Sequence, residues 1–328
     1  MKILKAIAAM MLISLFATGC GHVTYPKETL QESVAELCKE EYNIDIDVKW
    51  LGTTLALYLP LSNLFDINLS LSEDAQEKVQ DVLLSASRIV LSTDADVKFY
   101  CVIAQDIRIP EIQLIIIKYV DDVKRAFFYD ISRGEYFKRT LIDINENPQA
   151  KKEQSIIGVF EKMKLDDTMQ KKVLDDFFRS PPSSLEGIGY WQGKFYIKDI
   201  AMEEFLAQQM ASRVKTRFRE NEDLHKYTIK SVTGKFVTQD EFRFFLITFN
   251  AESLLFVIDP KERSAMEREI FKNIFETASN VVYGYKFKDF NFLKIAEETS
   301  QKELLVSKED IYLFKKKKMG IDTIMGAI

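Results

Sequence analysis

Hydrophobic and polar residues in the first half of the chain alternate between helical and strand spacing in a regular order. Apolar residues three and four positions apart, such as Leu30, Val34, Leu37 and Cys38, predict an amphipathic helix, and runs rich in β-branched and aromatic residues predict strands. The predicted elements are a helix over 28–42, strands over 44–50 and 53–59, a helix over 72–92, and strands over 97–104 and 112–119. The order α-β-β-α-β-β defines a first module, which we place at 28–145.

The second half of the chain repeats this order. Its predicted elements are a helix over 200–220, strands over 227–237 and 241–250, a helix over 260–278, strands over 281–288 and 291–295, and a further candidate strand over 311–314. The order corresponds while residue identity is low, so tandem duplication and two unrelated domains both remain open. The predicted fold class is α+β, built from two open α/β sandwich modules with helices on one face of each sheet.

A helical insert separates the two modules. Apolar spacing predicts short helices within 146–184, and the run Ser180-Pro181-Pro182-Ser183-Ser184 is the strongest breaker in the chain. We therefore place the second module at 185–328. It ends in a basic tail that begins with Lys315–Lys318, for which both a solvated terminus and a contact with anionic headgroups are open.

An aromatic segment opens the second module. The run 187–197 predicts a hairpin that turns at Gln192-Gly193, and its aromatic residues are Tyr190, Trp191, Phe195 and Tyr196. These side chains either pack in the core or form a partner surface, since exposed aromatic residues suit sugar stacking and protein interfaces.

The N-terminus carries an export signal. Lys2 and Lys5 precede an apolar stretch over 6–18, which has the length of a secretory signal and is too short to span a bilayer as a helix. The stretch ends in Ala17-Thr18-Gly19-Cys20, which resembles the lipobox of bacterial lipoproteins, although that family usually has Leu where this chain has Ala17.

The resemblance to bacterial lipoproteins implies a lipid anchor. In that family the cysteine receives a diacylglycerol, the signal is cut before it and the new N-terminus is acylated. Here this implies a signal peptide over 1–19, lipidation of Cys20, a tether over 20–27 and attachment to the bilayer through acyl chains. Gly21 is not the acidic residue that retains some lipoproteins at the inner membrane, so the resemblance implies the periplasmic face of the outer membrane.

The amino-acid composition argues against several classes of protein. The chain has 328 residues, of which 47% are hydrophobic, and this excludes a disordered protein. Its 45 Lys and Arg against 50 Asp and Glu give a net charge of −5, which argues against a nucleic-acid binder because such proteins need a basic face. Only two histidines are present, and catalytic, zinc and phosphate-loop motifs are missing. We therefore predict no catalytic residue, no metal site and no cofactor.

Adjacent carboxylates and two further cysteines are the remaining candidates. The pairs Asp121-Asp122, Asp166-Asp167 and Asp175-Asp176 are interpreted as capping or solvated residues. Cys38 and Cys101 lie on the apolar faces of their elements and are expected to point into one core, either as a disulfide or as two buried thiols.

These patterns favour a membrane-anchored, non-catalytic envelope lipoprotein that binds or scaffolds other envelope components, with an envelope protein as its expected partner. Two alternatives remain open. One is an enzyme that acts on envelope polymers through carboxylates in a cleft between the modules. The other is a carrier of an apolar ligand, which would need a large apolar cavity.

Overall fold

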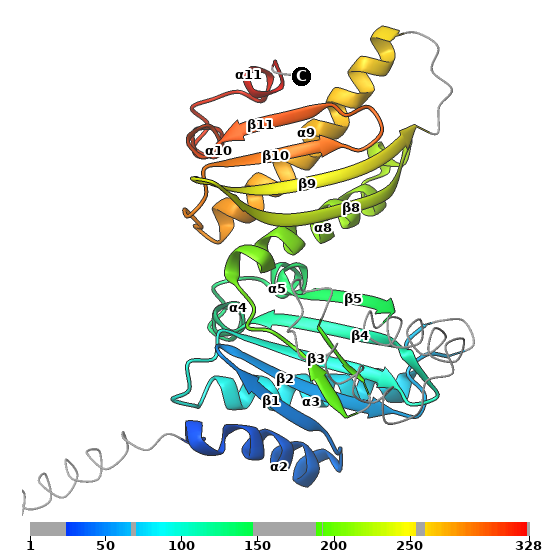
Figure 1. Cartoon of the computed structure of the whole chain (residues 1–328), viewed down its shortest axis with the longest axis vertical. Helices are drawn as coiled ribbons and strands as arrows, with labels where there is room; N and C mark the ends of the chain where they lie inside the picture. The colour runs from blue at the N-terminus through cyan, green and yellow to red at the C-terminus, as the bar shows by residue number, and fades with distance from the viewer. Residues whose placement is uncertain (1–23, 67–69, 147–187, 192, 254–259, 327–328) are drawn as a thin grey trace, which may run out of the picture.

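The computed structural model describes residues 24–66, 70–146, 188–191, 193–253 and 260–326 (Figure 1). The first half contains η1 Lys27–Thr29, α2 Leu30–Tyr42, β1 Asp47–Leu51, β2 Thr54–Leu61, α3 Glu73–Val90, β3 Phe99–Asp106, β4 Ile109–Tyr119, α4 Val120–Phe127, α5 Arg133–Arg139 and β5 Leu141–Glu146. The second half contains β6 Gly189–Trp191, β7 Lys194–Tyr196, α8 Met202–Glu220, η3 Glu222–Leu224, β8 Tyr227–Gln239, β9 Phe242–Ser253, α9 Pro260–Gly284, β10 Phe292–Glu297, β11 Glu303–Ser307, α10 Lys308–Lys315 and α11 Ile321–Met325.

The two main sheets share a four-stranded topology, to which the first sheet adds β5. The first has the strand order β1-β2-β3-β4-β5, and the second has the order β11-β10-β9-β8. Within β1–β4 and within β8–β11 the outer pairs are antiparallel and the middle pair is parallel, β2 with β3 and β9 with β10. The additional strand β5 pairs antiparallel with β4. Each parallel pair is connected through a helix, as parallel strands require. The predicted α+β class and the α-β-β-α-β-β order are therefore confirmed in both halves.

Two helices cover one face of each sheet. In the first module α2 and α3 pack over side chains such as Leu57, Tyr100 and Val102, which alternate along β2 and β3. In the second module α8 and α9 cover Phe245 and Leu293 in the same way. Along β10 and β11 of the second sheet buried and more exposed residues alternate, which selects one face for the core, whereas β2 and β3 of the first sheet are buried on both faces.

The opposite face of the first sheet is also covered. Cys101 and Ile115 on this face belong to a core that continues into the second module. The β6–β7 hairpin lies here, with the Tyr190 ring stacked on Tyr58 at 3.6 Å and the Tyr190 backbone hydrogen-bonded to the side chain of Gln113. The hairpin was expected in the second module, and the structure places it against the first sheet instead.

The segment between the hairpin and α8 is tied to the first module. The Asp199 carboxylate accepts hydrogen bonds from the backbone N–H of Thr53 at 2.8 Å and from the hydroxyls of Thr53 and Thr54 at 3.0 Å. The Thr54 hydroxyl in turn accepts a hydrogen bond from the Ile200 N–H at 2.8 Å. These contacts fix the point at which the chain passes from one module to the other.

Three sequence predictions in the second half are corrected by the structure. The predicted strand over 281–288 is wrong, because α9 continues to Gly284. The candidate strand over 311–314 lies in helix α10. The end of the basic tail is not solvated throughout, because Ile324 and Met325 are buried in the core of the second module.

Other predictions fall outside the described residues. These include the signal peptide, Cys20, most of the helical insert and the carboxylate pairs Asp166-Asp167 and Asp175-Asp176. Within the part of the chain that the structure describes, no helix is long and apolar enough to cross a membrane.

Candidate functional site

A buried ion pair lies where the two modules meet. Asp122, in the first turn of α4, and Arg139, at the end of α5, are both almost fully buried, and they form a salt bridge of 2.8 Å. The hydroxyl of Tyr285, which directly follows α9, donates a hydrogen bond to the other Asp122 oxygen. Burial, followed by the charge of Asp122, raises the pKa of Tyr285 well above its ordinary value. The ring of Tyr285 also lies 4.6 Å from the Arg139 guanidinium, so both modules contribute to this pair.

A second layer of polar contacts extends the pair towards α8. Glu135 accepts hydrogen bonds from Arg139 at 2.8 Å and from Arg213 at 3.3 Å. Burial alone would raise the pKa of Glu135, but hydrogen bonds and charge from the two arginines outweigh it and hold the pKa below its ordinary value. Gln209, which is buried in α8, donates to the backbone carbonyl of Arg139 at 2.6 Å. The orientation of α5 against α8 is thereby fixed.

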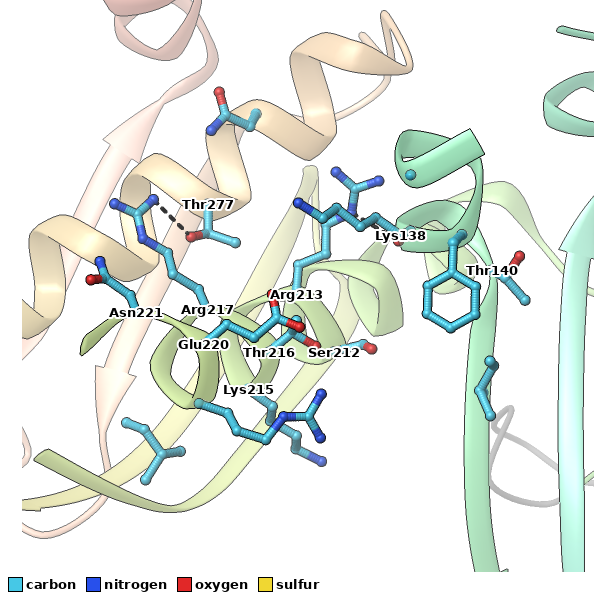
Figure 2. A pocket seen from close by; sticks show the side chains of 16 residues that line it. Lys138, Thr140, Ser212, Arg213, Lys215, Thr216, Arg217, Glu220, Asn221 and Thr277 are labelled. Atoms are coloured by element: carbon cyan, nitrogen blue, oxygen red, sulfur yellow. Dashed lines mark hydrogen bonds between the residues drawn. The ribbon is translucent and has the colours of Figure 1, made fainter. Parts of the chain in front are cut away.

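A groove opens beside this network, between α5 and β5 of the first module and α8, α9 and the start of β8 in the second (Figure 2). Its volume is about 1060 Å³. Figure 2 shows Arg213 extending from α8 towards Lys138 of α5, and Arg217 turned towards Thr277 of α9. The groove therefore takes side chains from both modules, and α8 supplies more of its described lining residues than any other element.

The groove is lined by more cations than anions. Among its described lining residues the cations are Lys138, Arg213, Lys215, Arg217 and Arg219, and the one carboxylate is Glu220. Two of these cations are held in place: Arg213 contacts Glu135, and Arg217 forms a 2.8 Å salt bridge with Glu276. The other three, Lys138, Lys215 and Arg219, are exposed and form no ion pair within the described residues. An anion that enters the groove would meet these three charges.

The wall formed by the first module is partly apolar. Phe137 of α5 and Ile142 of β5 line the groove, and both are exposed large hydrophobic side chains. Ile229 of β8 adds an apolar contact on the other side. The groove therefore suits a ligand that carries anionic groups next to a less polar body.

The aromatic hairpin is mostly packed rather than free. Tyr196 is buried, and Tyr190 and Phe195 are half-buried against the core of the first sheet. Their rings meet edge to face at 4.8 Å, and the Tyr190 hydroxyl donates to Asp47 at 2.9 Å. The side chain of Trp191 is not among the side chains that the structure describes. Of the two interpretations of this hairpin, the structure supports core packing for these three residues.

The two body cysteines lie in different cores. Cys38 packs with α2 and α3 on one face of the first sheet, and Cys101 lies on the opposite face. Both thiols are free and buried. Of the two alternatives, the structure supports two buried thiols and not the disulfide, because the two side chains lie on opposite faces of the sheet. Burial raises the pKa of the Cys101 thiol to about 12 and also raises the pKa of the Cys38 thiol. Both thiols are therefore protonated at neutral pH.

Sequence reasoning missed the residues that line the groove. A signal was present, since four cations alternate through Arg213, Lys215, Arg217 and Arg219 in the last two turns of α8. Cations are favoured near a helix C-terminus, so the local pattern alone has a structural explanation. What the sequence did not reveal is that α5 and α9 lie beside this part of the helix.

The carboxylates expected for an enzyme do not converge in this groove. Asp122 is engaged with Arg139, and Glu220 is the single acidic residue among the described lining residues. His225 is exposed, and its ring nitrogen contacts the Arg219 carbonyl at 2.9 Å. In the described part of the chain, no cluster of His, Cys, Asp and Glu side chains could hold a metal ion.

The fold and the groove together define a class: an α+β protein of two topologically equivalent modules with a cation-lined groove between them. Comparison with protein-family models, with curated proteins and with solved structures found no match in any of the three.

Proposed function

We propose that this protein is a lipid-anchored binding protein of the cell envelope that takes an anionic envelope component into the groove between its modules. The observation that carries the proposal is a set of three exposed cations, Lys138, Lys215 and Arg219, around a groove of about 1060 Å³. Among the residues that the structure describes, none of the three forms an ion pair. The chain as a whole is acidic, with a net charge of −5. A local excess of cations in such a chain focuses a positive potential on one place.

Phosphate and carboxylate groups are the chemistry that this groove recognises. Arginine and lysine bind such groups through charge-assisted hydrogen bonds, and partly enclosed cations are screened less than cations on an open surface. The cations along its walls favour an anionic ligand over the wholly apolar cargo of a carrier protein. An enzyme with paired carboxylates needs two of them at its site. Glu220 is the single carboxylate among the described lining residues, so the groove does not support this alternative.

The anchor is the second part of the proposal. The lipobox-like sequence supports acylation of Cys20 and attachment to the periplasmic face of the outer membrane. An anchored chain would hold the groove close to anionic polymers and lipids of the envelope. Binding or scaffolding, rather than turnover, is the activity that we propose.

The test compares two double variants that remove the same charge. Lys215→Ala/Arg219→Ala removes two cations from the groove, and Lys235→Ala/Lys288→Ala removes two exposed lysines of the second module outside it. The probes are polyphosphate and polygalacturonate, with neutral dextran as a blank, and affinity for the detergent-solubilised full chain is measured by calorimetry at two salt concentrations.

We expect the groove variant to lose about 100-fold or more in affinity, because two contacts to charged groups are lost and each contributes about 1.5 kcal/mol or more. The control variant should bind the polyanions nearly as tightly as the parent chain. Added salt should weaken the binding of both the control variant and the parent chain. Equal losses in the two variants, or no binding of either polyanion by the parent chain, would refute the groove as the binding site.

A further inference from the structure

An aromatic tip stands out on the first module. Phe127 ends α4, Phe128 and Tyr129 follow it, and the three side chains are 66%, 67% and 89% exposed. The Phe127 and Phe128 rings contact each other edge to face at 5.4 Å. Consecutive exposed aromatic residues are costly in water and usually mark a surface that contacts something else.

Hydrogen bonds to α4 hold the backbone of the tip. The N–H of Phe128 donates to the Lys124 carbonyl at 2.9 Å, that of Tyr129 to Ala126 at 3.2 Å and that of Asp130 to Arg125 at 2.8 Å. Tyr129 has φ of 61°, a left-handed conformation that glycine commonly takes at the end of a helix. An exposed tyrosine at this strained position is not explained by packing within the chain.

The helix that leads to the tip begins near the place where the N-terminal chain reaches the first module. Tyr25 forms a β-bridge with Thr93, and the Lys27 N–H donates to Asp94 at 2.8 Å. The same connection, 91–98, contacts the start of α4, because the Val120 N–H donates to the Lys98 carbonyl at 2.8 Å. Figure 1 shows α4 and the first residues of the described chain on the same side of the module.

The length of the tether places this side of the module near a bilayer. This step rests on the proposed lipidation of Cys20. The five residues from Cys20 to Tyr25 can span about 18 Å at most. The exposed cations Lys98 and Arg133, which form no ion pair within the described residues, flank α4 and suit anionic headgroups.

We infer that Phe127, Phe128 and Tyr129 insert into the membrane interface and form a second contact with the bilayer, besides the acyl anchor. Aromatic residues are favoured at the level of the headgroups, where an apolar ring and a polar hydroxyl are both accommodated. With two contacts, the first module has a fixed orientation on the membrane, and the second module does not rotate freely about the tether.

The test uses the lipidated full chain in vesicles of phosphatidylcholine and phosphatidylglycerol whose acyl chains are brominated. Phe128→Trp reports on the tip, and Phe242→Trp, on an exposed phenylalanine of the second sheet, is the matched control. Both sites are exposed, so neither substitution disturbs the core. The parent chain, with its two native tryptophans, gives the background.

We expect the tryptophan fluorescence that Phe128→Trp adds to the parent background to be about two-fold lower in brominated than in plain vesicles. The fluorescence that Phe242→Trp adds should be the same in both. Equal emission of Phe128→Trp in brominated and plain vesicles, with the chain floating together with the vesicles, would overturn the tip contact but leave the anchor intact. That result is also expected if a protein covers the tip. A chain that does not float with the vesicles would overturn the anchor, and the tip contact with it.

Discussion

At the residue scale, Asp121 and Asp122 are neighbours in sequence but not in environment. The Asp121 side chain is 58% exposed and contacts Lys124 at 3.5 Å. The Asp122 side chain is 4% exposed and contacts Arg139, which is itself buried. A charge that is buried with its partner is costly to leave alone, whereas an exposed pair contributes little.

Asp122→Ala is therefore expected to lower the free energy of unfolding by about 3 kcal/mol, because Arg139 would remain buried with one counterion fewer. The value lies at the low end for such a change because Glu135 still contacts Arg139. Asp121→Ala is the adjacent control, with an expected change within about 0.5 kcal/mol. Urea denaturation of both variants measures the difference, and similar losses would show that the ion pair does not stabilise the junction.

The sequence predicted that adjacent carboxylates cap helices or face solvent, and this holds for Asp121 but not for Asp122. The difference arises because Arg139 and Tyr285 reach Asp122 from 17 and 163 residues away. Similarly, the spacing of the cations on α8 is visible in the sequence. That they form a site depends on α5, which lies beside them only in the folded chain. Site residues that depend on long-range contacts are not recoverable from local spacing.

At the element scale, Gly234 sets the distance between α8 and β8. A Cβ atom at this position would lie 1.9 Å from the backbone carbonyl oxygen of Ala207 in α8. The Gln208 side chain donates to the Gly234 carbonyl at 3.2 Å, which holds helix and strand at this close approach. Glycine is needed here for space rather than for backbone freedom.

Gly234→Ala is expected to destabilise the protein by about 1–3 kcal/mol, because the contact is with backbone atoms that move only if the helix moves. Gly134→Ala is the matched control, since a Cβ there meets nothing within 4 Å. In the exposed helix α5 it should stabilise by about 0.5–1 kcal/mol. Thermal unfolding of the two variants gives the comparison, and shifts in the same direction would contradict this account of Gly234.

Elements with regular apolar spacing were predictable, and short or strongly packed elements were not. The segment 281–288 is rich in β-formers, yet Val281 and Val282 continue the buried face of α9 after Phe275 and Ala278, so packing overrides propensity. Helix α4 was missed because it follows β4 without a breaker, and α5 because it has only seven residues.

At the scale of the whole molecule, one of the two apolar cores extends across both modules. Phe205 at the start of α8 contacts Phe99 of the first sheet at 5.1 Å between ring centroids, and it contacts Tyr119 and Tyr285 at 6.2 and 6.1 Å. Phe205 is completely buried, and the apolar cluster continues through it from one sheet to the other. The modules are therefore expected to unfold together, since separating them would expose this cluster to water.

Phe205→Ala removes the ring that joins the modules and should lower the free energy of unfolding by about 3–5 kcal/mol. Phe271→Ala is the control, because Phe271 is equally buried but contacts Phe249 inside the second module. Both variants are expected to lose similar stability, and only Phe205→Ala should split the single calorimetric transition of the parent chain into two. Hydrogen exchange assigns each transition to a module. Two transitions in the parent chain, or splitting in Phe271→Ala alone, would show that the modules are not coupled through this contact, and the groove between them would then lack a fixed geometry.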